Sequence, residues 1–79
     1  MIYVNREIDG KYAVSYDING SLAHITKNKH RLRLYAVRDA VLLIRMLDKE
    51  GHNLSMAVIN KYNQWNIFGL INGNLTLIK

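Results

Sequence analysis

Apolar and polar residues alternate over several stretches of the chain, the pattern of strands that bury one face of a sheet. The clearest stretch is 11–18, where every second residue from Tyr12 to Ile18 is apolar or aromatic. A shorter alternation follows at 31–35, where Leu32 and Leu34 face one way. The pattern predicts that 31–35 continues the third strand or forms a short fourth one. The other strands are expected at 2–8, 11–18, 21–27, 53–61, 64–71 and 74–78.

Three dipeptides between these stretches favour tight hairpin turns. They are Asp9-Gly10, Asn19-Gly20 and Asn72-Gly73. Asn, Asp and Gly tolerate the positive φ that two-residue hairpin turns require. The sheet is therefore expected to be mostly antiparallel.

The periodicity changes to that of a helix in the middle of the chain. Val37, Ala40, Ile44 and Leu47 recur at helical spacing, and Gly51 stands where a helix C-cap glycine is expected. This pattern predicts one helix over about 37–50.

Together these elements predict an α+β fold in one domain, residues 1–79. The expected order is β-β-β(β)-α-β-β-β, with five to seven short strands and the helix on one face of the sheet. Tyr62, Trp65 and Phe68 are predicted to lie in the core.

Composition points to an intracellular protein outside the membrane. The chain has no Cys, and its longest apolar run, 40–44, is far shorter than the roughly 20 residues that span a bilayer. The N-terminus lacks the pattern of a signal peptide, so a cytoplasmic location is expected.

No group of residues in the sequence predicts catalysis, a metal site or a cofactor. His24, His30 and His52 lack the spacing of a helical metal-binding pair, and Glu7 and Asp9 flank a tight turn. We therefore expect a protein that is not an enzyme and has no small-molecule substrate.

Positive charge is concentrated between Asp17 and Asp39, an interval without acidic residues in a chain of net charge +5. If 31–35 is extended, its basic residues and Tyr35 form a row that could contact phosphates and stack on a base. This basic row, 27–38, is the predicted nucleic-acid site: Lys27, Lys29, Arg31, Arg33, Tyr35 and Arg38.

The predicted helix carries a second candidate surface. Leu42 and Met46 fall among basic residues on the side opposite the apolar stripe, which favours contact with a protein partner or a second copy. The predicted protein interface comprises Arg38, Leu42, Arg45, Met46 and Lys49.

The order of elements over 11–47, closing with the sequence Tyr35-Ala36-Val37-Arg38-Asp39-Ala40, resembles in outline the arm-type DNA-binding domains of phage integrases. This resemblance covers less than half of the chain, and it implies DNA contact by a module in a nucleic-acid-handling system. The chain also resembles the small accessory proteins of phages and mobile elements. That resemblance implies an inhibitor or adaptor that binds a host complex, such as a nuclease or defence complex, at an acidic or nucleic-acid-binding surface.

Overall fold

The computed structural model describes residues 1–18, 21–24 and 29–79. These residues form one helix, α1 (Arg33–Lys49), and a sheet of six strands. The strands are β1 (Ile2–Arg6), β2 (Tyr12–Ile18), β3 (Ser21–His24), β4 (Ser55–Ile59), β5 (Trp65–Ile71) and β6 (Asn74–Leu77). The α+β class and the predicted order of elements are confirmed.

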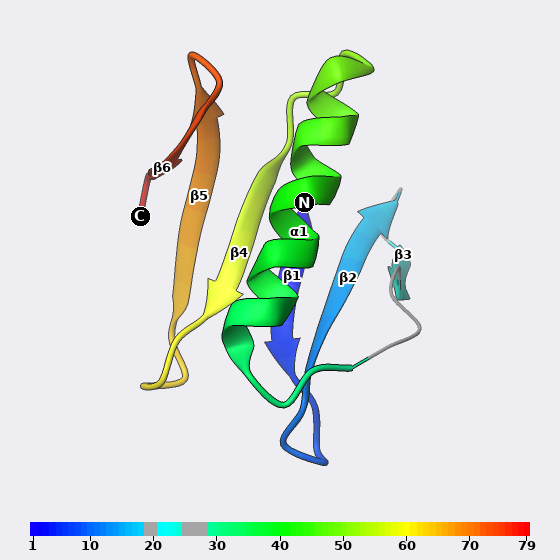
Figure 1. The fold of residues 1–79 in the computed structure, drawn as a ribbon, viewed down its shortest axis with the longest axis vertical. Helices are drawn as coiled ribbons and strands as arrows, with labels where there is room; N and C mark the ends of the chain where they lie inside the picture. Colours follow the sequence, from blue (N-terminus) through cyan, green and yellow to red (C-terminus); the bar gives the residue numbers. More distant parts are fainter. Residues whose placement is uncertain (19–20, 25–28) are drawn as a thin grey trace.

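The strand order across the sheet is β3-β2-β1-β4-β5-β6. Four neighbouring pairs are antiparallel, and β1 and β4 are parallel. The pair is parallel because β3 runs in the same direction as β1, and the crossover through α1 returns the chain in that direction beside β1. Figure 1 shows α1 lying across the middle of one sheet face, with β5 and β6 to one side of it.

The core lies between α1 and the central strands. The helix buries Ala36, Ala40 and Ile44, and it packs on β1, β2 and β4. Small alanines bring the helix backbone close to the sheet. The larger side chain of Ile44 fills space between the helix and the sheet. The buried side chains that meet them from the strands are Ile2, Val4, Val14, Met56 and Val58.

The helix begins at Arg33, so the predicted start at 37 and the predicted strand over 31–35 are both wrong. The N-cap residue is Leu32, which has no side-chain hydrogen bond to the first turn. Helix starts are usually marked by Ser, Thr, Asp or Asn. Leucine gives no such signal, and the alternation of residues before it mimicked a strand.

The predicted C-terminus of the helix is confirmed at Gly51. This glycine has φ +90°, and its N–H donates to the carbonyl of Asp48 at 3.0 Å. The N–H of His52 donates to Leu47, also at 3.0 Å, which completes a Schellman motif. A residue with a Cβ would be strained at this φ.

The turn predictions have mixed outcomes. Asn72-Gly73 forms the two-residue turn that joins β5 to β6, with φ values of 53° and 78°. Asp9-Gly10 lies in a longer loop, because the N–H of Glu7 donates to the carbonyl of Lys11. Asn19-Gly20 lies outside the described residues.

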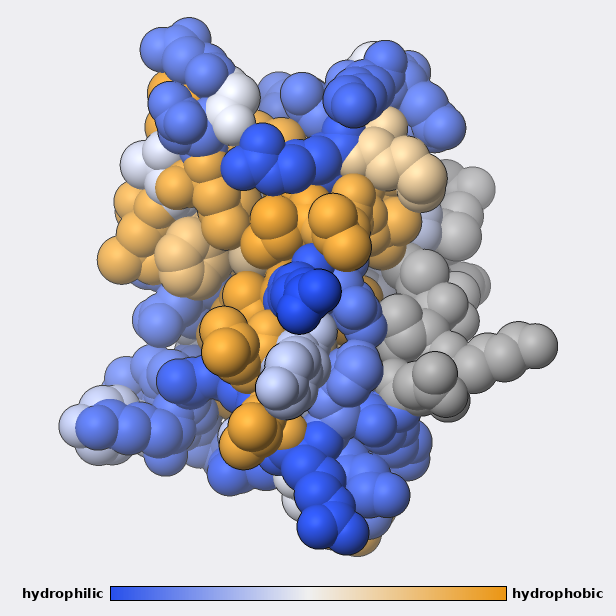
Figure 2. Space-filling view, viewed as in Figure 1, coloured by the Kyte–Doolittle hydropathy of each residue, from blue (hydrophilic) through white to orange (hydrophobic). Residues whose placement is uncertain are grey.

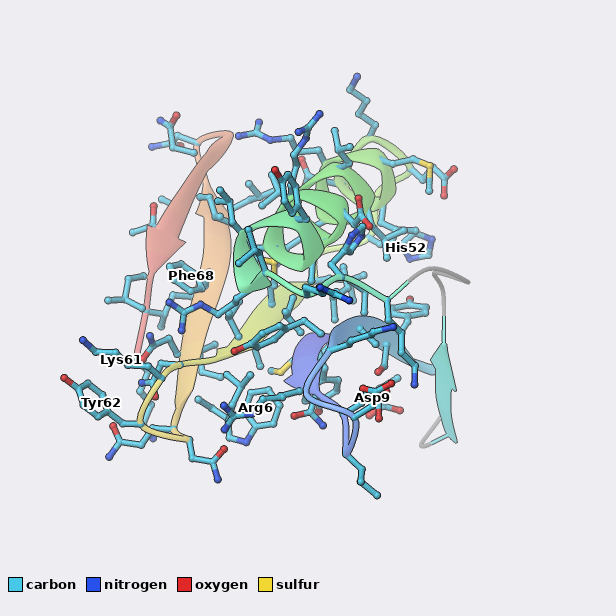
Figure 3. The ribbon with its side chains drawn as sticks, turned by 60° about the horizontal axis from the view of Figure 1, so that its bottom comes forward. Arg6, Asp9, His52, Lys61, Tyr62 and Phe68 are labelled. Atoms are coloured by element: carbon cyan, nitrogen blue, oxygen red, sulfur yellow. The ribbon has the colours of Figure 1, made fainter. Side chains whose placement is uncertain are left out.

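Two of the three aromatic residues assigned to the core are on the surface. Trp65 is 43% exposed and Tyr62 is 70% exposed, whereas Phe68 packs against the core. Figure 3 shows Lys61 and Tyr62 extending outward from the β4–β5 turn. In the part of the chain that the structure describes, no helix is long and apolar enough to cross a membrane.

Candidate functional site

The basic row does not form a single surface, because its second half is helical. Residues two apart on a helix differ by about 200° in direction. Arg33 turns toward the sheet, where its Nη1 donates to the carbonyl of Ile59 at 3.4 Å. Tyr35 points to the other side and lies against His30, with ring centroids 6.0 Å apart.

The remaining residues of the row differ in their environment. Lys29 Nζ lies 3.4 Å from Asp9 Oδ2 in an exposed ion pair. The backbone N–H of Lys11 and then Lys29 lower the pKa of Asp9, so this carboxylate holds its charge next to the lysine. Arg31 is exposed just before the helix, and Lys27 lies outside the described residues.

A histidine–aspartate pair fixes the segment that leads into α1. The backbone groups of His30 and Tyr12 exchange two hydrogen bonds, at 2.7 and 2.9 Å, along the edge of β2. The His30 Nε2 lies 2.7 Å from Asp39 Oδ2 on the helix. One residue therefore joins the sheet edge to the second turn of the helix.

We expect a double-mutant cycle on His30→Ala and Asp39→Ala to show a coupling of about 0.5–1.5 kcal/mol in the free energy of unfolding. The contact is partly exposed, which keeps the expected value modest. Urea denaturation of the four proteins measures it. Additive losses would show that the two side chains do not stabilise each other.

The outer helix face is the side of α1 that points away from the sheet. It consists of Leu34, Tyr35, Arg38, Leu42, Arg45, Met46 and Lys49, all of them exposed. Its side chains Leu34, Leu42 and Met46 are 70%, 64% and 51% exposed. Figure 2 shows apolar surface interspersed with hydrophilic side chains along the helix.

The charges on this face follow a pattern. At about 100° per residue, the three cations Arg38, Arg45 and Lys49 lie within about 40° of one another, close to its centre. The two acids of the helix, Asp39 and Asp48, fall at its two margins. The face therefore has a cationic centre with large apolar side chains beside it.

The outer helix face contains every residue of the predicted protein interface, and it adds Leu34 and Tyr35. Leu34 was missed because the helix was expected to begin three residues after it. It lies eight residues before Leu42, so extending the helical wheel toward the N-terminus would have found it. Arg45 also contacts the β5–β6 turn, where its Nη1 donates to the carbonyl of Gly73 at 3.3 Å.

A groove lies between α1 and the strands β5 and β6. The helix does not cover these two strands (Figure 1). The groove has a volume of about 270 Å³, and its apolar walls include Val37, Phe68 and Leu75. Arg33 supplies the charged group of its lining. This volume is just below the 300–1,000 Å³ typical of small-molecule sites, and the groove brings together no acid–base pair.

The described residues contain no group of three or more His, Cys, Asp or Glu side chains placed to hold a metal ion. Comparison with known protein families, with curated proteins and with solved structures found no match to the chain.

Proposed function

We propose that this protein is a non-catalytic binding module that uses the outer helix face to hold an acidic surface of a partner protein. The observation that carries the proposal is the exposure of Leu34, Leu42 and Met46 among arginines. Protein interfaces are enriched in Met, Arg and aromatic residues, and their energy comes mainly from apolar side chains that leave water on binding.

The charge of the face defines the partner further. Three cations at its centre favour a partner with carboxylates that face them. The leucines beside the cations exclude water from the interface, which strengthens such ion pairs. Such a cationic face is repelled by the basic, phosphate-binding site of a nuclease, so the surface that it holds is an acidic one elsewhere on the partner complex. The proposed role is therefore that of an inhibitor or adaptor of the phage or mobile-element type, acting on a host nuclease or defence complex.

Capture from a host lysate treated with nuclease tests this role. The parent protein and Leu42→Glu/Met46→Glu serve as baits, and the bound proteins are identified by mass spectrometry. We expect the parent to retain a partner that the variant loses and that 0.5 M salt weakens, because ion pairs are screened. Identical sets of proteins on both baits would contradict the proposal.

Nucleic acid is the second candidate partner, and the observation that favours it is the line of exposed cations from Arg31 through Arg38 and Arg45 to Lys49. Each neutralised phosphate contributes about −0.7 to −0.9 to the log–log dependence of affinity on salt. Four cations would give a slope of about −3 to −4.

Titration of labelled DNA and RNA at two salt concentrations measures this slope. If the cations bind phosphates, Arg31→Ala/Arg38→Ala flattens the slope by nearly two units. Tyr35→Ala weakens single-strand binding by about 1–3 kcal/mol and leaves the slope unchanged. No measurable binding near physiological salt would remove nucleic acid as a partner.

A further inference from the structure

The groove between α1 and the strands β5 and β6 carries a positive charge that the outer helix face does not include. Of the described residues that line the groove, six are apolar, none is acidic, and the three polar ones are Arg33, Asn60 and Asn66. All three polar residues are half-buried. The groove is therefore a second, separate surface with its own chemistry.

The polar residues of the groove lie together at one end of it. α1 and β5 run in the same direction, and β4 runs the opposite way and ends near the start of the helix (Figure 1). On α1, Val37 follows Arg33 by four residues, or about 6 Å of helix rise. On β5, Phe68 follows Asn66 by two residues, or about 7 Å of strand. Arg33, Asn66 and Asn60 are thus near the start of the helix, and the apolar pair lies one helical turn farther on.

The two asparagines offer hydrogen-bond donors to the groove. Asn60 Oδ1 already accepts the backbone N–H groups of Tyr62 and Gln64, at 2.9 and 3.0 Å. Its NH2 group, which can only donate, remains. Among the described residues, no group hydrogen-bonds the side chain of Asn66. Both amides can therefore donate to a bound molecule.

The guanidinium of Arg33 adds charged donors beside them. One of its five N–H groups reaches the carbonyl of Ile59, at 3.4 Å. Among the described residues, no carboxylate pairs with Arg33. The polar end of the groove thus combines one positive charge with several free donors and no acid, which is the arrangement that binds an anion.

We propose that this groove binds a small monocarboxylate with an apolar body, of the size of a medium-chain fatty acid. The carboxylate accepts hydrogen bonds from Arg33, Asn60 and Asn66, and the apolar body lies against Val37 and Phe68. A carboxylate is an acceptor only, so it matches a site whose free groups are donors. The site is separate from the outer helix face, and the inference does not rest on the proposed function.

Charge and size favour this ligand over other anions. One guanidinium balances one negative charge, whereas a phosphate monoester carries about −1.5 to −2 at pH 7. The groove volume of about 270 Å³ is below the range for drug-sized ligands, which favours a smaller molecule. Two arginines also fix the walls, because Arg33 ties the first helical turn to β4 and Arg45 ties the third turn along to Gly73.

Titration of octanoate, followed by methyl NMR of the labelled protein, tests the site. We expect a dissociation constant between about 10 µM and 1 mM, as for a ligand of about ten non-hydrogen atoms. The methyl signals of Val37 and Leu75, which line the groove, should shift. Those of Ile71 and Ile78, on the opposite side of the sheet, should stay. An absence of shifts up to about 5 mM octanoate contradicts the proposal.

Control ligands separate the carboxylate from the apolar body. Octan-1-ol lacks the charge and butyrate has a shorter chain, so each should bind at least about tenfold more weakly than octanoate. Octanol binding as tightly as octanoate would overturn the carboxylate contact. Butyrate binding as tightly as octanoate would overturn the apolar contact.

Arg33→Gln removes the charge at the polar end of the groove. It should weaken octanoate binding by about tenfold and leave octanol binding within about twofold of the parent. The matched control is Lys11→Gln, which lowers the net charge equally at an exposed position outside the groove. Equal losses of octanoate affinity in the two variants would show a response to overall charge and contradict the site.

Asn66→Asp tests the same end without a change of side-chain size, and it serves if Arg33→Gln does not fold. The new carboxylate repels the ligand and competes for Arg33, so octanoate affinity should fall by at least about tenfold. Asn53→Asp, at an exposed position before β4, makes the same change outside the groove and should stay within about twofold of the parent. Far-UV circular dichroism and thermal unfolding check that the variants fold. A folded Asn66→Asp protein that binds octanoate as the parent does overturns the proposal.

Discussion

Ile44→Ala should lower the free energy of unfolding by about 2–5 kcal/mol, the range for truncation of a buried branched side chain. Ile44 is 1% exposed and belongs to the buried cluster between α1 and the sheet. A chain of this length has a total stability of roughly 4–12 kcal/mol, so the loss removes a large share of it. Chemical denaturation measures the change, and the melting temperature should fall by at least about 10 °C.

Leu42→Ala is the matched control on the same helix. Leu42 points away from the sheet, and its truncation should change stability by less than about 0.5 kcal/mol. Alanine also favours the helix slightly more than leucine does. Equal losses in the two variants would mean that the side chains of α1 are wrongly assigned to the core and to the outer helix face.

Arg38→Glu/Lys49→Glu should weaken binding to the acidic partner protein by about 100-fold or more. The reason is that two attractive ion pairs become repulsive in a surface that leaves water on binding. Both residues are exposed, so the fold should persist. Surface plasmon resonance with the captured partner, at two salt concentrations, measures the dissociation constant.

The control for net charge is Lys11→Glu/Lys61→Glu. These lysines are exposed in the β1–β2 and β4–β5 turns, away from the helix, and the variant has the same net charge as the first. We expect an affinity within about threefold of the parent. A comparable loss in both variants would show that the partner responds to overall charge and not to the outer helix face.

The sequence predicts the parts of the fold that short-range chemistry determines. Gly51 and Asn72-Gly73 mark a helix end and a hairpin turn because their positive φ values restrict which residues can occupy them. The helix start was misplaced for the converse reason, since Leu32 caps it without a characteristic side chain. The error carried over to the basic row, of which Arg31, Arg33 and Tyr35 were assigned to one face of a strand.

Long-range pairing accounts for the other errors. Nothing near β1 in the sequence indicates that β4 will lie parallel to it. Trp65 was assigned to the core because of its size, whereas its aromatic contact is with Tyr3, on a sheet face that α1 does not cover. The exposure of Leu42 and Met46 could be predicted, because a helical wheel needs only the local period.

The most direct test of the outer helix face as the binding surface is a methyl NMR footprint of the captured partner on the labelled protein. The Leu34, Leu42 and Met46 methyls lie on this face, and those of Ile67, Ile71 and Ile78 lie on the opposite side of the sheet. We predict that partner binding shifts or broadens the first three signals and leaves the second three unchanged. Perturbation confined to the isoleucines would contradict the account.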